Sequence, residues 1–151
     1  MPPPSDEPVS EKTLQQVVDE LGAYPLDAFR FVEEGLSYTV ALRDTRRAEE
    51  RKKRESSQPE KEESRHLTGQ ELCEGLREFA LKQWGLMART VLQRWGITCT
   101  FDFGRIVFAL IDAARMQKTD EDTIDDFRDV YDFKAAFEHE YRIERGQQDH
   151  P

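Results

Sequence analysis

The sequence contains few of the residues that build disulfide frameworks, and it has no stretch suited to spanning a membrane. Its 151 residues include two cysteines, Cys73 and Cys99. Two are too few for a disulfide scaffold, which indicates a reducing compartment. No apolar run approaches the roughly 20 residues that cross a bilayer, and the N-terminal residues do not resemble a signal peptide. We therefore expect a cytoplasmic protein without a membrane partner.

Motifs that mark enzymes and metal centres are also missing. The three histidines, His66, His139 and His150, do not stand at ligand spacing from a cysteine or from one another. The tripeptide from Asp102 to Gly104 has the letters of a protein-kinase motif, but the other kinase motifs are absent. No local motif places a histidine beside a cysteine to activate it. The sequence thus predicts no catalytic residue, no cofactor and no metal ligand, and we expect that the protein is not an enzyme.

Charge is abundant and unevenly distributed. The chain has 22 Lys and Arg against 31 Asp and Glu, which gives a formal net charge of -9. An acidic chain is poorly suited to coating nucleic acid or anionic membrane with its whole surface. Between residues 43 and 66 the only apolar residue is Ala48. This segment cannot bury enough surface to offset the entropy lost when it is ordered.

We therefore predict a single domain over residues 9–145 that contains a solvated, charged linker at 43–66. Apolar residues are concentrated on both sides of this linker, so the two halves are expected to pack together across it. Its first part, residues 43–54, is compatible with an extension of the preceding helix, which must end before Pro59. The tails at 1–8 and 146–151 are expected to be disordered.

Helical patterns dominate the first apolar part of the chain. From Leu14 to Leu21, apolar residues recur at positions i, i+3, i+4 and i+7, and Gly22 ends the pattern. Pro25 suits the first turn of the next helix because its ring presets a helical backbone angle. Residues 26–42 then carry apolar residues on more than one side, which predicts a helix buried on more than one face.

The second apolar part begins with the clearest local signal in the sequence. Thr68 and Glu71 form an S/T-x-x-E capping box at the start of a helix. Gly85 and Gly96 each stand where a left-handed residue ends a helix. This spacing predicts two short helices joined tightly rather than one long helix. In the second of them we expect Met87 to face inward with the apolar residues that follow it.

Residues 97–111 allow two interpretations. The first half alternates in polarity and is compatible with a hairpin that turns at 102–105. The apolar run continues without a turn signal, however, and Asp102 is a good N-cap for a helix beginning at Phe103, so the helix is favoured. Residues 123–141 have an acidic start and helical apolar spacing, which predicts a last helix. The expected fold class is all-α, a small bundle of about six or seven helices.

Two charged clusters supply the candidate partner-binding residues. The acidic stretch at residues 119–132 lacks the alternating acids, central glycine and terminal glutamate of an EF-hand calcium site. Acids also favour the first turns of helices, where they complement the helix dipole. Clustered charge nevertheless steers association with an oppositely charged partner. The acidic candidates are Asp120, Asp122, Asp125, Asp126 and Asp129, and the basic candidates are Arg51, Lys52, Lys53 and Arg54.

Four motifs taken together resemble one protein family. They are YPLDAFRFV at 24–32, HLTGQELC at 66–73, WGI followed by FDFGRIVF within 95–108, and DFRDVYDF at 126–133. The set resembles a family of uncharacterised small bacterial proteins, found in planctomycetes and verrucomicrobia and named after a Methylacidiphilum hypothetical protein. The resemblance spans residues 11–138 and implies a bacterial, cytoplasmic, single-domain protein. It implies no functional residues, because that family has no assigned activity.

The sequence favours a non-enzymatic protein-interaction or adaptor module. No reactive constellation is present, whereas charge is sorted into one acidic and one basic cluster. The expected partner is an unidentified protein, and the same sorting would serve a homo-oligomer in which one copy's basic cluster meets another's acidic cluster. The alternative is a nucleic-acid-associated regulator, with a helix-turn-helix at 68–95 and a wing-like hairpin at 97–111. Its second helix would offer Arg89 and Arg94 as basic residues.

Overall fold

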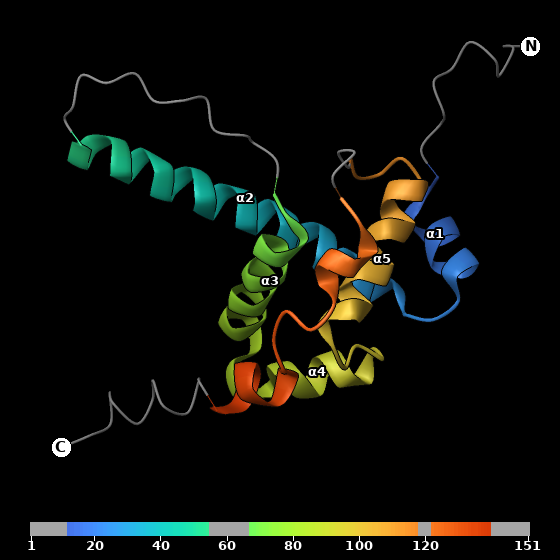
Figure 1. The fold of residues 1–151 in the computed structure, drawn as a ribbon. Helices are drawn as coiled ribbons and strands as arrows, with labels where there is room; N and C mark the ends of the chain where they lie inside the picture. Colours follow the sequence, from blue (N-terminus) through green and yellow to red (C-terminus); the bar gives the residue numbers. More distant parts are fainter. Residues whose placement is uncertain (1–11, 55–66, 118–121, 140–151) are drawn as a thin grey trace, which may run out of the picture.

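The computed structural model describes residues 12–54, 67–117 and 122–139, and every regular element within these ranges is helical (Figure 1). The all-α class is therefore confirmed. The α-helices are α1 (Leu14–Leu21), α2 (Leu26–Arg54), α3 (Gly69–Trp84), α4 (Ala88–Arg94) and α5 (Thr100–Asp112). Short turns of other helix types are η2 (Gly85–Met87), η3 (Ile124–Phe127) and η4 (Ala135–His139). The described ranges hold five α-helices, one or two fewer than the six or seven helices expected for the bundle.

None of the helices in the described ranges is long and apolar enough to cross a lipid bilayer. The tails predicted at 1–8 and 146–151, and the second part of the predicted linker, lie outside the described residues.

The beginning and end of α1 follow its local sequence. Thr13 is the N-cap, and its hydroxyl accepts a hydrogen bond from the backbone N–H of Gln16 at 3.1 Å. The Gln16 side chain returns the bond to the Thr13 backbone N–H at 2.8 Å, which completes a capping box. At the other end, Gly22 adopts the left-handed conformation with φ of 69°. The predicted stop is confirmed, since glycine takes this conformation without a Cβ clash.

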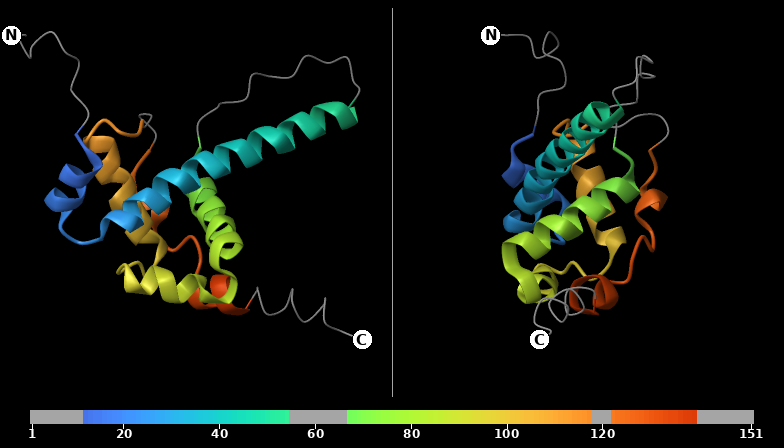
Figure 2. Two further views of the ribbon diagram at one scale, coloured as in Figure 1. Left: turned by 180° about the vertical axis from the view of Figure 1, so that it is seen from behind. Right: turned by 90° about the vertical axis from the view of Figure 1, so that its left-hand side faces the viewer.

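Helix α2 has 29 residues, which is about 43 Å at 1.5 Å per residue. Its N-terminal half lies against α3 and α5, whereas its C-terminal half projects away from them (Figures 1 and 2). We call this projecting half, residues 43–54, the arm. The sequence allowed a helical extension here, and the structure confirms it. Glu49 and Glu50 each precede a basic residue by four positions, the orientation that stabilises an exposed helix.

Helices α2 and α3 cross with their backbones in close approach. A Cβ atom added at Gly75 would overlap the side chain of Thr39, and one added at Gly35 would overlap Leu76. The Thr39 hydroxyl donates a hydrogen bond to the Gly35 carbonyl at 2.6 Å, so this buried polar group is satisfied within its own helix. Two glycines, one on each helix, therefore set how closely the two longest helices approach.

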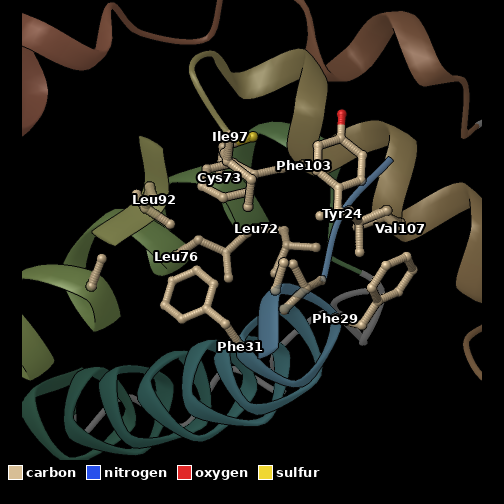
Figure 3. Close-up of a cluster of buried hydrophobic side chains, with 14 of the residues drawn as sticks. Tyr24, Phe29, Phe31, Leu72, Cys73, Leu76, Leu92, Ile97, Phe103 and Val107 are labelled. Atoms are coloured by element: carbon tan, nitrogen blue, oxygen red, sulfur yellow. The ribbon is translucent and has the colours of Figure 1, made fainter. Parts of the chain in front are cut away.

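The core lies where α2, α3, α4 and α5 meet (Figure 3). The Phe31 ring is its aromatic centre, with its centroid 5.3 Å from that of Trp84 and 5.9 Å from that of Trp95. The two tryptophans also contact each other edge to face at 5.5 Å, a favoured aromatic geometry. Both tryptophans are thus packed against the core. The largest fully buried side chains include Phe29, Phe103, Phe137, Leu76, Leu92, Ile97, Ile106 and Leu110.

Within residues 97–111 the chain forms a helix from Thr100 on, as the sequence favoured, but the helix begins earlier than expected. Helix α5 starts at Thr100 with Cys99 as the N-cap residue, so the prediction of Asp102 as N-cap was wrong. Asp102 instead stands one turn inside, where its carboxylate accepts hydrogen bonds from the backbone N–H groups of Thr98 and Cys99 at 2.9 and 3.3 Å. A carboxylate in the first turn satisfies N–H groups as well as a true N-cap does. The hairpin wing of the nucleic-acid alternative is consequently not formed.

Asp102 also ties α5 to the loop before α2. The Tyr24 hydroxyl donates a hydrogen bond to Asp102 at 2.5 Å and accepts one from Arg105 at 3.1 Å. Burial and the neighbouring Asp102 carboxylate raise the pKa of Tyr24 well above its ordinary value, so the phenol remains the donor. This contact holds the start of α2 against the start of α5.

The junction between α3 and α4 differs from the prediction at one residue. Gly85 ends α3 with φ of 53°, and a turn of 3₁₀ helix, η2, precedes α4. Met87 belongs to η2 and is 57% exposed, so the expectation that it faces inward was wrong. The extra turn shifts the helical phase, because a 3₁₀ helix has three residues per turn instead of 3.6.

We predict that Gly75→Ala destabilises the protein. An alanine in a helix interior normally stabilises it by up to about 1 kcal/mol relative to glycine. Here the new methyl group overlaps Thr39, and we expect a net loss of about 1–3 kcal/mol because the helices must separate. Urea denaturation followed by circular dichroism measures the change, with exposed Ser37→Ala on α2 as the control. A Gly75→Ala variant as stable as the parent would refute the crossing constraint.

Candidate functional site

The acidic cluster forms a turn rather than the predicted helix. Residues 123–141 were expected to be one helix, but η3 ends at Phe127, Arg128 is extended, and Asp129 has a positive φ of 50°. The aromatic ring of Phe127 explains the break. It lies so close to Gly69 and Gly104 that a Cβ on either would come within 3 Å of Phe127 atoms. We call residues 122–132 the acidic turn.

A buried hydroxyl holds the acidic turn to α5. Thr100 is fully buried, and its hydroxyl donates a hydrogen bond to the Phe127 carbonyl at 2.6 Å. The same oxygen accepts a hydrogen bond from the Val130 backbone N–H at 3.1 Å. In a continuous helix, the Phe127 carbonyl and the Val130 N–H would form hydrogen bonds within the helix, but here both bond to the Thr100 hydroxyl instead. Tertiary contacts therefore override the helical pattern in this segment.

Most of the described acidic candidates have local structural partners. The Asp126 carboxylate accepts a hydrogen bond from the Thr123 backbone N–H at 3.1 Å. Asp125 forms an exposed ion pair with Arg128 at 2.6 Å. Asp122 lies at the edge of a cleft, and Asp129 is exposed at the bend. Within the described residues no group of three or more acidic, histidine or cysteine side chains could hold a metal ion. Asp120 lies outside those residues.

An apolar cleft of about 540 Å³ lies beside the acidic turn. Its walls come from α2, the start of α3, α5 and the segments on either side of residues 118–121. Asp122 and Phe127 both line it, so one side of the acidic turn is a wall of the cleft. With Phe127 included, nine apolar side chains line the cleft: Leu36, Val40, Leu67, Leu72, Val107, Phe108, Ile111, Met116 and Phe127.

The polar rim of the cleft is held in place by an ion pair between distant segments. Arg115 pairs with Glu33 of α2 at 3.1 Å, and both side chains are about one quarter exposed. Arg115 also donates a hydrogen bond to the Lys12 carbonyl at 3.2 Å. The rim therefore joins the start of the described chain, α2 and the end of α5. Because Arg115 faces Glu33, the positive charge at this edge is largely neutralised.

A second hollow of about 490 Å³ lies between the arm and α3, and it shares Leu67 with the cleft. Arginines line its α2 side and glutamates its α3 side. Arg46 and Glu78 form an ion pair at 3.4 Å, which contributes little to stability because both side chains are substantially exposed. The lining includes Arg43, Arg46 and Arg47 opposite Glu71, Glu74 and Glu78. Unlike the cleft, this hollow is lined mainly by charge.

The four basic candidates, Arg51 to Arg54, lie at the far end of the arm, away from the acidic turn (Figure 2). The structure therefore does not bring the two charged clusters together within one chain. At 100° per residue, Arg43, Arg47 and Arg51 fall within an arc of about 80°. The same face of α2 carries apolar residues in its packed half. The inner face of α2 thus changes from apolar to arginine where the helix leaves the core.

The two cysteines have opposite environments. Cys73 is fully buried, and burial raises the pKa of its thiol well above the ordinary value. Cys99 is exposed, with its sulfur 3.5 Å from the Asp102 carboxylate. Cys73 therefore packs in the core.

The cleft was not predicted from the sequence, and no local sequence pattern indicates it. Leu36, Val40 and Ile111 carry ordinary helical spacing, and a residue that lines a cleft has the same pattern as one that is fully buried. Only the packing of three helices against the acidic turn leaves these side chains partly uncovered. Asp122 was identified from its charge, whereas its position at the cleft depends on Phe127.

No family model, curated protein or solved structure matches this chain. The resemblance to the uncharacterised bacterial family therefore stays a prediction, and function is inferred from the geometry alone.

We predict that Thr100→Val destabilises the protein by about 1–3 kcal/mol. Valine keeps the shape of threonine but leaves the Phe127 carbonyl and the Val130 N–H without their buried partner. Hydrogen exchange should accelerate at Val130 more than in α3. Exposed Thr90→Val on α4 is the control, and equal exchange at Val130 in both variants would contradict the proposed role of Thr100.

We also predict that one thiol reacts with a disulfide reagent in the native protein and two react in urea. The thiolate is the nucleophile, and a raised pKa leaves less thiolate at any given pH, so Cys73 should be protected. Cys99→Ser should abolish the native reaction, whereas Cys73→Ser should preserve it. Rapid native labelling of Cys73 would show that α3 opens readily.

Proposed function

We propose that this protein is a non-enzymatic protein-interaction module whose docking site is the apolar cleft with the acidic turn as one wall. The observation that carries the proposal is the cleft itself, with about 540 Å³ lined by nine apolar side chains and bordered by Asp122. Grooves between helices bind partner segments by accepting apolar side chains at helical spacing. Neighbouring charge then selects the partner and accelerates the encounter.

The charge of the site favours a partner segment that is apolar with basic flanks. The acidic turn carries five aspartates against Arg128, and Arg115, which also lines the cleft, already pairs with Glu33. The stretches next in sequence to the lining residues Leu67, Gln117 and Asp122, residues 55–66 and 118–121, contain no aliphatic or aromatic residue. By composition, these two stretches have no apolar side chain to place in the cleft. A partner that supplies such side chains fits the site better.

A second candidate function uses the arm. Its arginine face suits contact with phosphates, which would make the protein a nucleic-acid-associated regulator. No aromatic side chain interleaves the arm to stack on bases, so such contact would be independent of sequence. We rank this function second because the wing that it requires at 97–111 is not formed, and the chain there is helical from Thr100 on.

A differential pull-down from native lysate at low salt, with and without nuclease, tests the proposal. The baits are the parent, Ile111→Glu in the cleft, and Gln93→Glu on exposed α4 as a control with the same added charge. We expect a stoichiometric partner that resists nuclease, is retained by the control and falls at least ten-fold with Ile111→Glu. Thermal unfolding by circular dichroism checks the folding of each bait, and Val40→Glu on another wall provides a second cleft variant.

The outcomes separate the two functions. If both cleft variants recover the same partners as the parent, the cleft is not the docking site. If partners disappear with nuclease, the result supports the nucleic-acid function. Replacing Arg51, Lys52 and Lys53 with glutamate should then abolish the recovery of those partners.

A further inference from the structure

Two large apolar side chains are exposed in the part of the chain that the structure describes. They are Leu86, which is 45% exposed, and Met87, which is 57% exposed. They are consecutive, and both belong to η2 at the junction of α3 and α4. Single exposed apolar residues are common on protein surfaces, but here all the large ones in the described ranges occur at one point. We call Leu86 and Met87 the knob.

The backbone is specifically shaped to present the knob. Gly85 has φ of 53° and ψ of -128°, a region open essentially to glycine alone. This residue turns the chain out of α3, and η2 follows before Ala88 becomes fully buried. Basic residues flank the knob in sequence, with Lys82 in the last turn of α3 and Arg89 in the first turn of α4. The knob is therefore an apolar pair with basic neighbours.

The knob has the chemistry that the cleft requires, but one chain cannot bring them together. The knob lies at the end of the molecule where α3 meets α4 (Figure 1). The cleft is lined by residues from the C-terminal end of α5, from α2 and from the start of α3, and the C-terminal end of α5 lies far from the junction of α3 and α4 (Figure 2). The contact can form only between different molecules.

We propose that a second copy of this chain docks on the cleft, inserting its Leu86–Met87 knob while Lys82 and Arg89 approach the acidic turn. This inference rests on the proposed function, because it uses the cleft as the docking site and names its occupant. The match has two independent parts, an apolar knob for an apolar cleft and basic flanks for an acidic wall. The arm is a poorer occupant, since Ala48 is its only apolar residue.

The geometry also specifies the type of assembly. The two contacting surfaces differ, so the interface is heterologous, and an open assembly always keeps one unused knob at one end and one unused cleft at the other unless a ring closes. The assembly should therefore grow with concentration or close into a ring. An apolar contact should persist in molar salt, where charged contacts alone would be screened.

Light scattering coupled to size-exclusion chromatography tests this proposal with two complementary variants. Met87→Glu places a charge on the knob, and Ile111→Glu places one in the cleft. We expect the parent to exceed the monomer mass at sub-millimolar concentration and each variant alone to remain monomeric. An equimolar mixture should form a dimer of twice the monomer mass and grow no further, because it retains one intact knob and one intact cleft. Gln93→Glu should behave as the parent does, and Val40→Glu replaces Ile111→Glu if that variant unfolds.

Each alternative has its own result. A parent that stays monomeric overturns the proposal, while a foreign partner lost with Ile111→Glu would still support the cleft as a docking site. A symmetric contact between knobs predicts that Met87→Glu alone dissociates the assembly and that the mixture forms no complex with it. Assembly that survives both substitutions but dissolves in molar salt would point to the arm and the acidic turn, and would likewise overturn the proposal.

Discussion

The close crossing of α2 and α3 is the constraint on which the rest of the structure depends. Gly35 and Gly75 let the two helices approach until no Cβ would fit on either side. Helix α3 then carries Leu76 and Phe79 against α2, and Phe31 of α2 reaches both tryptophans. A wider crossing would open the core on one side and the cleft on the other. Gly35 and Gly75, which have no side chains, thus fix the helix spacing on which both the core and the cleft depend, because packed interiors tolerate little change in volume.

A second pair of glycines allows the acidic turn to pack closely against α3 and α5. Gly69 and Gly104 leave room for Phe127, and Thr100 supplies the two hydrogen bonds that hold the chain around it. The burial of one large ring and the satisfaction of two backbone groups outweigh the helical preference of the segment. Because the anchoring is tertiary, Asp122 and Phe127 of the turn line the cleft. A surface helix would instead have spread them around its circumference.

Charge in this protein serves two purposes that the structure separates. Asp102 and Asp126 act within their own turns, where their carboxylates accept backbone hydrogen bonds. Asp122 borders an apolar cleft, and the arm carries its arginines beyond the core. A carboxylate that caps backbone N–H groups mainly fixes the shape of its turn, and it adds to the negative electrostatic potential of the surface only as a secondary effect. The proposed docking site consequently combines an apolar surface for affinity with a charged border for selection.

The helical class, the capping box at Thr68, the stop at Gly22 and the helical extension into the arm could all be predicted from the sequence. These features depend on interactions between residues three or four positions apart, which a linear pattern contains in full. Only the tertiary structure decided the break at Phe127, the exposure of Met87 and the existence of the cleft. Each of these depends on contacts between residues far apart in sequence, such as Phe127 with Gly69 and Gly104. Apolar spacing predicts which face of a helix turns inward, but what the neighbouring elements leave uncovered is settled only when they pack.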